Sequence, residues 1–530
     1  MSRYAFIVVI PVADRPRHLD ACLGSLRELL RRFPYDREIT VLLADDSADA
    51  ASIDAHRELA RRHAADGLHI LHFAPDEQHA LVHALDAGLP RVLGNAPRER
   101  FGHKGQGVMR NIAYLKVAEM LRGRSDDEVL VWSLDSDQEF RVDVAEDDGY
   151  IIDYFGGLDA IFSRTNTQVL TGKVVGDPPV SPAVMTNNFL DDVLAFLGQT
   201  SRLDPAAPCS HHGVAASTGD AAYHDMADLF GFRPADHYAY PCPVAAPHSE
   251  ADGCAHFAGR VNSFFYGEHP TRISSYQPAE LFSTVQPART VYAGNYVFRP
   301  AALNYFIPFG PLRLRMSGPT LGRILKAELG PRFVSANLPM LHRRTVESGG
   351  QSEFRPGIET RQEETRRADP SVSSPPGGRS PQGGDFGGGL VIDMSGEFER
   401  QFYGDTMLFT VEKLTAGGDL RRLASADFSP ALDAMRAEML ERYNTRRQLI
   451  LDKLARLDAL LDDDTCWWHA QPGRIAGFRR FAANVRRNFG EDSVGHARIN
   501  DAAAWRQWRA RLLEGLEHYA ADRTAWERQL

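Results

Sequence analysis

The sequence opens on YAFIVVIP at residues 4–11, a continuous apolar run typical of a β-strand that is covered on both faces. Three further runs of this kind follow, EITVLLA at 38–44, LHILHF at 68–73 and EVLVWSL at 128–134. Between them, apolar residues recur at helical spacing, as in residues 18–32. Because strands that alternate with helices form parallel βαβ units, the sequence predicts an α/β fold with a mostly parallel sheet between layers of helices.

Composition narrows the class of protein. A chain of 530 residues predicts two to four domains, and its 60 Lys and Arg against 70 Asp and Glu give a net charge of −10, which argues against a general nucleic-acid binder. The five cysteines are odd in number and widely spread, so they do not predict a disulfide framework. No stretch approaches the ~20 apolar residues of a membrane span. We therefore expect a cytoplasmic protein without a transmembrane segment.

The chain divides into three parts by pattern. Residues 1–345 carry the alternation of strands and helices, which becomes less regular from 141 and includes an insertion at 198–285. Residues 346–392 are rich in Gly, Pro and Ser, and we interpret them as a flexible linker or loop. Residues 393–530 show apolar residues at helical spacing, which predicts a helical C-terminal region.

Two acidic motifs stand at predicted strand ends. Asp135-Ser136-Asp137 follows the fourth strand, and alternate residues of an extended segment face the same side, so we expect both carboxylates to share one site. Oxygen ligands of this kind suit Mg²⁺ or Mn²⁺, although an acidic turn would show the same pattern. Asp45-Asp46 ends the second strand, where a carboxylate either accepts hydrogen bonds from a nucleoside or caps the next helix.

Two further features suit an anionic ligand and its metal. Residues 101–111, FGHKGQGVMRN, open a predicted helix with Lys104 and Arg110, and helix starts of this kind favour anions, although a flexible loop is an equal alternative. His342 follows an apolar segment, and its imidazole could complete a metal site beside the carboxylates or remain an ordinary core histidine.

The insertion is rich in potential zinc ligands: Cys209, His211, His212, Cys242, His248, Cys254 and His256. Their spacings are irregular and include no C-x₂-C pair, which structural zinc sites commonly contain. We therefore interpret this segment as an active-site loop rather than as a zinc site.

Taken in chain order, several segments resemble the GT-A fold glycosyltransferases, in particular the family 2-like group of nucleotide-diphospho-sugar transferases. The segments are IPVADRPRHLDACLGSL at 10–26, DDS at 45–47, GQGVMRNIA at 105–113, WSLDSD at 132–137, YAGNYVFR at 292–299 and PMLH at 339–342. The resemblance implies a Rossmann-like GT-A domain, with a nucleotide-binding half at about 1–140 and an acceptor-side half at 141–345. It also implies a UDP- or GDP-sugar donor, Mn²⁺ or Mg²⁺, and a small-molecule or glycan acceptor.

The resemblance also assigns roles to particular positions. Nucleotide contacts would come from Pro11, Val12, Asp14, Asp45, Asp46, Gly105, Arg110, Asp135 and Ser136. Asp135 and Asp137 would act in catalysis, with Asp137 and His342 as the metal ligands. On the acceptor side the candidates are Gly294 and Asn295, and also Lys173 and Asp177 beside a Pro-rich loop that could equally be structural.

One departure concerns the catalytic base. Inverting members of this group usually carry an acidic pair before a helix that follows the acceptor-side strand, but residues 312–323, LRLRMSGPTLGR, contain no carboxylate. The base would then be Asp191, Asp192 or Glu268, or the enzyme would retain configuration. A non-catalytic nucleotide-sugar-binding protein is the alternative function. A sugar-phosphate nucleotidyltransferase is less favoured, because PVADRP at 11–16 lacks the glycines that its triphosphate loop requires.

Overall fold

The computed structural model describes residues 2–85, 89–97, 101–124, 128–142, 149–211, 240–271, 276, 278–344, 358–362 and 390–530. The strands are β1 Ala5–Val12, β2 Ile39–Asp45, β3 His69–Phe73, β4 Val129–Leu134, β5 Gln138–Glu139, β6 Val169–Gly176, β7 Gln286–Pro287, β8 Asn295–Phe298, β9 Phe333–His342, β10 Glu359–Gln362 and β11 Leu390–Asp393. The α-helices are α1 Pro16–Arg32, α2 Ala50–Ala65, α3 Pro75–His83, α4 Pro90–Leu93, α5 Gln106–Leu121, α6 Tyr154–Arg164, α7 Pro182–Thr200, α8 Glu250–Arg260, α9 Ser317–Leu329, α10 Ser395–Thr415, α11 Phe428–Asp462, α12 Ala476–Phe489, α13 Val494–Asn500 and α14 Ala502–Glu527.

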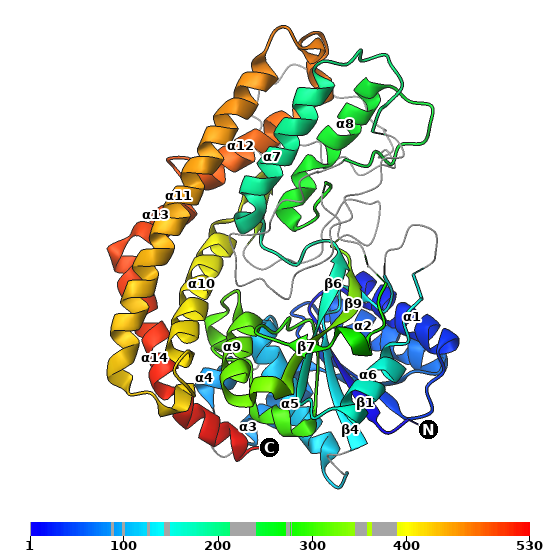
Figure 1. Cartoon of the computed structure of the whole chain (residues 1–530), viewed down its shortest axis with the longest axis vertical. Helices are drawn as coiled ribbons and strands as arrows, with labels where there is room; N and C mark the ends of the chain where they lie inside the picture. The colour runs from blue at the N-terminus through cyan, green and yellow to red at the C-terminus, as the bar shows by residue number, and fades with distance from the viewer. Residues whose placement is uncertain are drawn as a thin grey trace.

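A nine-stranded, mostly parallel sheet forms the lower part of the molecule in Figure 1. Its order is β3-β2-β1-β4-β8-β6-β9-β5, and β7 pairs with β9 beside this path. β1 lies between β2 and β4, parallel to both, with Val8 opposite Val41 and Trp132. β8 runs antiparallel between β4 and β6. The four strands expected in the first third of the chain are confirmed, and so is the α/β class.

Successive side chains of β1 explain why its sequence is apolar throughout. Ile7 and Val9 belong to the core on one face of the sheet, together with α5. Phe6 and Val8 belong to the core on the other face, together with α1 and α6. All four side chains are at most 1% exposed. Full burial of one such side chain contributes about 1.5–3 kcal/mol, so a strand covered on both faces needs apolar residues at every position.

Helix α7, the insertion that follows it and the C-terminal region form one helical unit, shown at the top of Figure 1, where α7 and α8 lie beside α11 and α12. Phe189 of α7 stacks on Phe264 at a ring distance of 4.3 Å and meets Phe481 of α12 edge-on at 5.4 Å. Asn262 donates a hydrogen bond to the carbonyl oxygen of Gly477 at 3.0 Å. The hydrophobic core therefore continues across the boundary that the sequence pattern places between these two parts.

The far end of the C-terminal region returns to the sheet domain. Trp526 of α14 is fully buried and donates from Nε1 to the carbonyl oxygen of Leu303 at 2.8 Å. Asp522 of the same helix accepts two hydrogen bonds from Arg91 of α4, at 2.7 and 2.9 Å. The predicted helical C-terminal region is confirmed, and it packs against the α/β part through α10, which contacts α9, as well as through α14.

Part of the stretch 346–392, expected to be a flexible linker, is ordered. β10 and β11 form an antiparallel pair, in which Glu359 lies opposite Asp393. Asn484 and Asn488 of α12 accept hydrogen bonds from the backbone N–H groups of Ile392 and Met394, at 3.0 and 2.7 Å. Within the predicted linker or loop, these two short stretches are therefore strands, and side chains of α12 bond the backbone of β11 and of the residue after it. Residues 363–389 lie outside the part of the chain that the structure describes.

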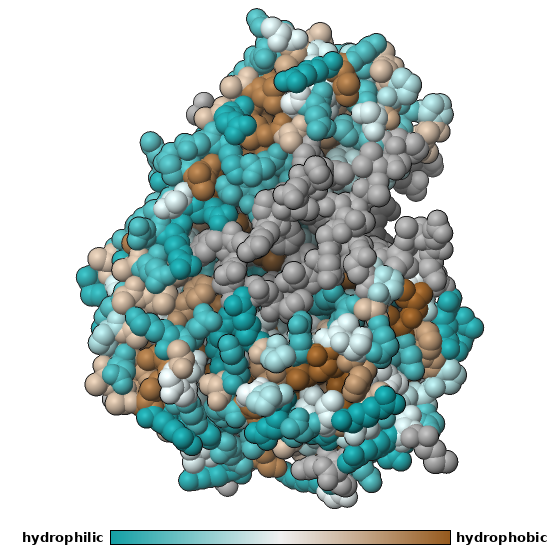
Figure 2. Space-filling view, in the orientation of Figure 1, coloured by the Kyte–Doolittle hydropathy of each residue, from teal (hydrophilic) through white to brown (hydrophobic). Residues whose placement is uncertain are grey.

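The surface shown in Figure 2 is mainly hydrophilic, and its hydrophobic residues form small, separate patches. Among the residues described, the large apolar side chains that are exposed are few and none exceeds 48% exposure. None of the helices within those residues combines the length and apolar character needed to cross a membrane.

A buried carboxyl group lies inside the helical region. Asp405 of α10 accepts hydrogen bonds from Gln401 at 2.7 Å and from the Tyr443 hydroxyl of α11 at 2.5 Å. No basic side chain bonds directly to it among these contacts, and burial raises the pKa of Asp405 to about 7. The folded protein therefore keeps this group protonated at pH values where an ordinary aspartate is ionised.

This burial predicts a pH dependence of stability. Between about pH 4 and 7 the unfolded chain releases the Asp405 proton and the folded chain keeps it, so the free energy of unfolding falls as pH rises, by an amount on the order of 4 kcal/mol. We expect Asp405→Asn to lose less stability than the wild type between pH 5 and pH 8 in urea titrations. Asp458→Asn, an exposed aspartate on α11, is the control, and equal slopes for all three proteins would contradict the prediction.

Candidate functional site

The loops that follow β1 and β2 meet the start of α5 at the carboxyl edge of the sheet. The N–H of Asp46 donates to the carbonyl oxygen of Val12 at 2.7 Å. The Asp46 carboxylate accepts hydrogen bonds from the N–H groups of Lys104 at 3.0 Å and Gly105 at 3.1 Å. Lys104 Nζ also lies 2.7 Å from Asp46 Oδ1. Asp46 therefore fixes the glycine-rich loop that leads into α5, and occupies two backbone N–H groups of that loop.

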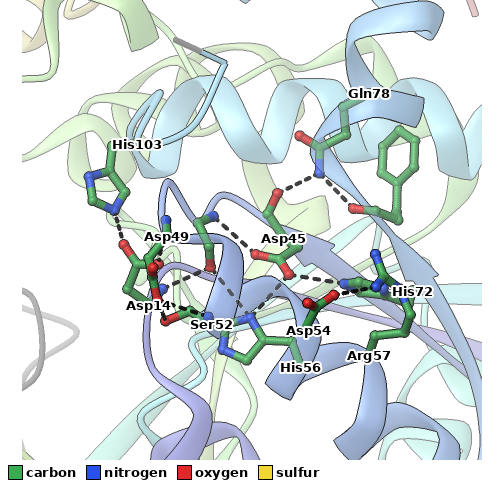
Figure 3. A network of polar contacts seen from close by, with 12 residues as sticks. Asp14, Asp45, Asp49, Ser52, Asp54, His56, Arg57, His72, Gln78 and His103 are labelled. Carbon is green, nitrogen blue, oxygen red and sulfur yellow. Dashed lines mark hydrogen bonds and ion pairs between the residues drawn. The ribbon is translucent and has the colours of Figure 1, made fainter. Parts of the chain in front are cut away.

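Asp45 is enclosed by two histidines (Figure 3). Its Oδ2 lies 3.0 Å from His56 Nδ1 and 3.0 Å from His72 Nε2, and its Oδ1 accepts a hydrogen bond from the N–H of Ser47 at 3.0 Å. Burial acts to raise the pKa of Asp45, but the hydrogen bonds from His56, His72 and Ser47 hold it below its ordinary value. Both oxygens are engaged inside the protein, so the expectation that Asp45 contacts a nucleotide is corrected: Asp45 joins β2, α2 and β3.

Asp14 connects the same loops from the β1 side. Its backbone is in the left-handed region at φ 51°, and its N–H donates to Ser47 Oγ at 2.9 Å. Its Oδ1 accepts from the N–H of Asp49 at 3.2 Å, and its Oδ2 contacts His103 Nε2 (Figure 3). The side chain is 16% exposed, more than those of Asp45 and Asp46. Pro11 and Val12 lie just before it, at the buried end of β1.

Asp135 is positioned by a buried arginine. Arg110 of α5 is 1% exposed, and its Nη2 lies 2.5 Å from Asp135 Oδ1 while its Nε donates to Ser133 Oγ at 3.1 Å. On the other side, a Cβ atom added to Gly294 would lie only 2.3 Å from Asp135 Oδ2. The absence of a side chain at Gly294 therefore lets the chain entering β8 pass directly against this carboxylate. Arg110 and Gly294 together hold Asp135 in place.

The two aspartates of the motif do not share one extended segment. β4 ends at Leu134, and Asp135 begins a turn. The N–H of Gln138 closes this turn by donating to the carbonyl oxygen of Asp135 at 3.2 Å. Ser136 is buried inside this turn at 4% exposure. The expectation from strand alternation is therefore wrong in its geometry: the turn directs Asp135 toward Arg110 and Asp137 toward a different set of residues.

Asp137 is buried among cationic side chains, and we name this group, Asp137 with Arg15, His342 and Arg344, the Asp137 corner. Its Oδ2 lies 3.1 Å from Arg15 Nη1 and 3.5 Å from both His342 Nε2 and Arg344 Nη1. Burial acts to raise the pKa of Asp137, but these neighbours hold it well below its ordinary range. Its Oδ1 is buried and has no hydrogen-bond partner among the residues described.

His342 is oriented by Asp177. His342 Nδ1 lies 2.6 Å from the carbonyl oxygen of Asp177, so Nδ1 carries a hydrogen, and Nε2 is the ring nitrogen that faces Asp137. The Asp177 N–H donates to the His342 carbonyl oxygen at 2.9 Å, and its carboxylate accepts from the N–H of Arg344 at 2.8 Å. Asp177, expected to contact sugar or acceptor, therefore positions two members of the Asp137 corner.

The corner fits a divalent cation. An ionised carboxylate oxygen without a partner and the inward-facing nitrogen of a neutral imidazole are both ligands for Mg²⁺ or Mn²⁺, and a backbone carbonyl on the far ring nitrogen is the usual support of a ligating histidine. Two ligands at about 2.1 Å from one octahedral ion stand about 3 Å apart, and the Asp137 oxygen that also faces the two arginines, Oδ2, lies 3.5 Å from His342 Nε2. Two protein ligands leave the other positions of such an ion open.

Two residues expected on the acceptor side are buried in the sheet. The Asn295 amide accepts from Trp132 Nε1 at 3.0 Å and donates to the carbonyl oxygens of Lys173 at 2.8 Å and Leu338 at 2.7 Å. It thus joins β8 to β4, β6 and β9 where the β6–β9 register shifts, and the expected acceptor contact of Asn295 is corrected to a structural role. Lys173 is 4% exposed in the same region.

The three candidate bases lie in different surroundings. Asp191 is ion-paired with Lys453 of α11 at 2.7 Å, and Asp192 is 1% exposed and accepts a hydrogen bond from Thr271 at 2.7 Å. Glu268 is paired with Arg260, and the next residue, His269, directs its N–H toward Asp177 Oδ1 at 3.4 Å. Of the three, Glu268 belongs to the segment that reaches the Asp137 corner.

Arg15 and Arg344 were not among the residues singled out from the sequence. Both are adjacent to residues that were: Arg15 follows Asp14, and Arg344 comes two positions after His342. A guanidinium next to a proposed diphosphate site is a recognisable signal, because arginine pairs with phosphate oxygens in a bidentate way. Only the folded chain, however, brings the two arginines to the same carboxylate.

A comparison with known protein families finds no family model that matches this chain, and a comparison with curated proteins finds no match either.

The enclosure of Asp45 predicts a large loss of stability on its removal. Asp45→Ala leaves two buried imidazoles without their shared acceptor, and we expect the free energy of unfolding at pH 7 to fall by roughly 3 kcal/mol. Because the pKa of Asp45 is lowered in the folded state, its contribution is present above about pH 4 and declines as pH falls below that value. The deficit of the variant should therefore shrink between pH 5 and pH 3 in urea titrations.

The control for this experiment is Asp54→Ala, an exposed aspartate on α2 with a 72% exposed side chain. We expect it to change stability by less than about 0.5 kcal/mol. An equal effect of the two substitutions would show that the Asp45 contacts do not stabilise the fold.

Proposed function

We propose that this protein is a metal-dependent glycosyltransferase with a GT-A fold, which moves a sugar from a nucleotide-diphosphate sugar to a hydroxyl group of a small-molecule or glycan acceptor. The observation that carries the proposal is the Asp137 corner: a buried carboxylate with an unpartnered oxygen, facing a histidine nitrogen and flanked by two arginines. This combination suits a cation together with a diphosphate.

The architecture supports the proposal. In open, mostly parallel sheets, ligands bind outside the carboxyl ends of the strands. The loops after β1 and β2 and the turn after β4 all lie at that edge, since the three strands are parallel. β9 also ends there, at His342. A mostly parallel sheet with helices on both faces is compatible with the GT-A fold that the sequence resembles.

In the proposed reaction, a divalent ion held by Asp137 and His342 would act as a Lewis acid toward the negative charge that develops on the departing nucleoside diphosphate. Arg15 and Arg344, the cations nearest to Asp137, would pair with phosphate oxygens of the donor. Arg110 would keep Asp135 directed toward the nucleotide side. The residues of the chain thus place positive charge where the leaving group gains negative charge.

The first test is ligand binding. We expect UDP or GDP, together with Mn²⁺, to raise the melting temperature of the wild type, because a ligand that binds only the folded chain stabilises it by mass action. Each nucleotide is measured with and without Mn²⁺, and ADP serves as the comparison. The same shift with and without the metal would contradict the metal site, and no shift with any nucleotide or nucleotide sugar would contradict the proposal.

The second test is turnover. We expect Asp137→Asn to reduce transfer, or slow hydrolysis of the nucleotide sugar, by roughly 10²-fold or more, because the metal ligand is lost while the volume of the side chain is kept. Asp458→Asn on α11 is the matched control and should keep full activity. Tight nucleotide binding without any turnover by the wild type would favour the alternative of a non-catalytic nucleotide-sugar-binding protein.

The stereochemistry of the transfer decides whether Glu268 is expected to act as the catalytic base. If NMR shows that the product anomer is inverted, we expect Glu268→Gln to lower kcat with little change in KM for the donor, because only the deprotonation of the acceptor is impaired. The same kcat loss in Asp191→Asn would contradict this assignment, because the structure pairs Asp191 with Lys453, away from the corner.

A further inference from the structure

Three potential metal ligands converge in the insertion. The ligand atoms of Cys209, Cys242 and His248 all lie within 4.8 Å of one another, and no other such group of three occurs among the residues that the structure describes. Cys242 Sγ lies 3.3 Å from His248 Nε2. At Zn–S and Zn–N bond lengths of about 2.3 and 2.1 Å, a tetrahedral ion places these two ligand types about 3.6 Å apart. The cluster therefore already has nearly the spacing that zinc requires.

Backbone hydrogen bonds bring the three segments together. The N–H of Cys209 donates to the carbonyl oxygen of His248 at 3.0 Å. The N–H of Cys242 donates to the carbonyl oxygen of His211 at 3.0 Å. The three ligands thus lie on short stretches of backbone that are hydrogen-bonded to one another. These hydrogen bonds keep the ligand side chains close together.

Helix α8 closes the cluster from another side. A Cβ atom added to Gly253, in the first turns of α8, would lie 2.7 Å from Cys209 Sγ and 3.7 Å from Cys242 Sγ. A glycine at this position therefore allows the helix to approach both thiols directly. The site has a helix backbone as one wall rather than open solvent.

A buried carboxylate adds negative charge beside the cluster. Glu250, two residues after His248, is 2% exposed. Its Oε1 accepts a hydrogen bond from the N–H of Ser210 at 2.6 Å, and its Oε2 is buried with no hydrogen-bond partner within the described part of the chain. Burying a carboxylate oxygen without a partner is unfavourable unless a cation lies nearby. Glu250 is therefore a second, independent indication of a cation at this place.

We propose that Cys209, Cys242 and His248 bind a structural zinc ion, with both cysteines as thiolates and Glu250 as the neighbouring anion. Sulfur and imidazole ligands select zinc over Mg²⁺ and Mn²⁺, so this ion is different from the one proposed at the Asp137 corner. Binding releases the two thiol protons to solvent and leaves the charge of the metal unchanged. The sequence favoured an active-site loop because the ligand spacing is irregular; the convergence of the three ligands in the fold is what favours zinc instead.

The site has a structural consequence. Cys209 and Cys242 lie in the described residues on either side of 212–239, so zinc would join these two flanking stretches to the start of α8. After α8, a 3₁₀ helix at Val261–Tyr266 leads to His269, whose N–H faces Asp177 Oδ1 at 3.4 Å. Asp177 in turn orients His342. The zinc ion would therefore stabilise the helix that precedes a segment in contact with the Asp137 corner.

Metal content tests the proposal directly. The full chain, purified without a polyhistidine tag in buffers free of chelators, should contain about one zinc per chain by mass spectrometry of the metal. We expect Cys209→Ser and Cys242→Ser to lose most of it, and Cys466→Ser to keep it, because Cys466 is a buried cysteine in another part of the chain. Wild-type protein without zinc, or Cys209→Ser protein with full zinc, would overturn the proposal.

A second set of measurements uses the wild-type protein, so it tests the proposal even if the cysteine variants fail to fold. Wild-type protein in which Co²⁺ replaces zinc should show the intense absorption of tetrahedral Co²⁺–thiolate bonds, and removal of zinc should lower the melting temperature, which zinc but not Mg²⁺ restores. A disulfide between Cys209 and Cys242, found by mass measurement of the intact chain, would also overturn the proposal. These readouts do not use turnover, so they stand or fail independently of the proposed transferase.

Discussion

A carboxylate buried inside a protein requires compensating positive charge, and Asp137 obtains it from two distant parts of the chain. Arg15 precedes α1, whereas His342 and Arg344 come at the end of β9 and just after it. The sheet makes this possible, because the short strand β5 that follows Asp137 pairs with β9, and Gln138 lies opposite His342. The chemistry of the corner therefore depends on this one strand pairing.

The two acidic motifs look alike in the sequence and differ in the fold. Asp45 and Asp137 both follow parallel strands and both are buried, but the oxygens of Asp45 are filled by two histidines and a backbone N–H. Asp137 keeps one oxygen without a partner among the residues described and is balanced by charge instead. A strand-end carboxylate whose oxygens are all engaged stabilises its surroundings, and one with an open oxygen can bind a cation. How the neighbouring groups are distributed over the two oxygens decides between the two, because all three neighbours of Asp137 face Oδ2.

The two metal sites that we propose differ in chemistry and are linked through the chain. Oxygen and imidazole ligands at the proposed Asp137 site suit a hard cation such as Mg²⁺ or Mn²⁺, which would bind together with the substrate. Two thiolates and an imidazole in the insertion suit a zinc ion that stays bound to the protein. Between them run α8 and the segment at His269 that contacts Asp177. The helical unit formed by the insertion and the C-terminal region thus reaches the site through a short stretch of backbone.

The sequence by itself determined the strands β1 to β4 and the helices α1 and α5, though not α3 and α4, because apolar periodicity depends on local backbone geometry and on which faces are buried. It also placed the acidic motifs at strand ends. Only the tertiary structure decided which of these carboxylates has a partner on both oxygens. It also decided that Asn295 is hydrogen-bonded inside the sheet and that Cys209, Cys242 and His248 converge. These outcomes depend on strand register and on contacts between residues far apart in sequence, which no local pattern records.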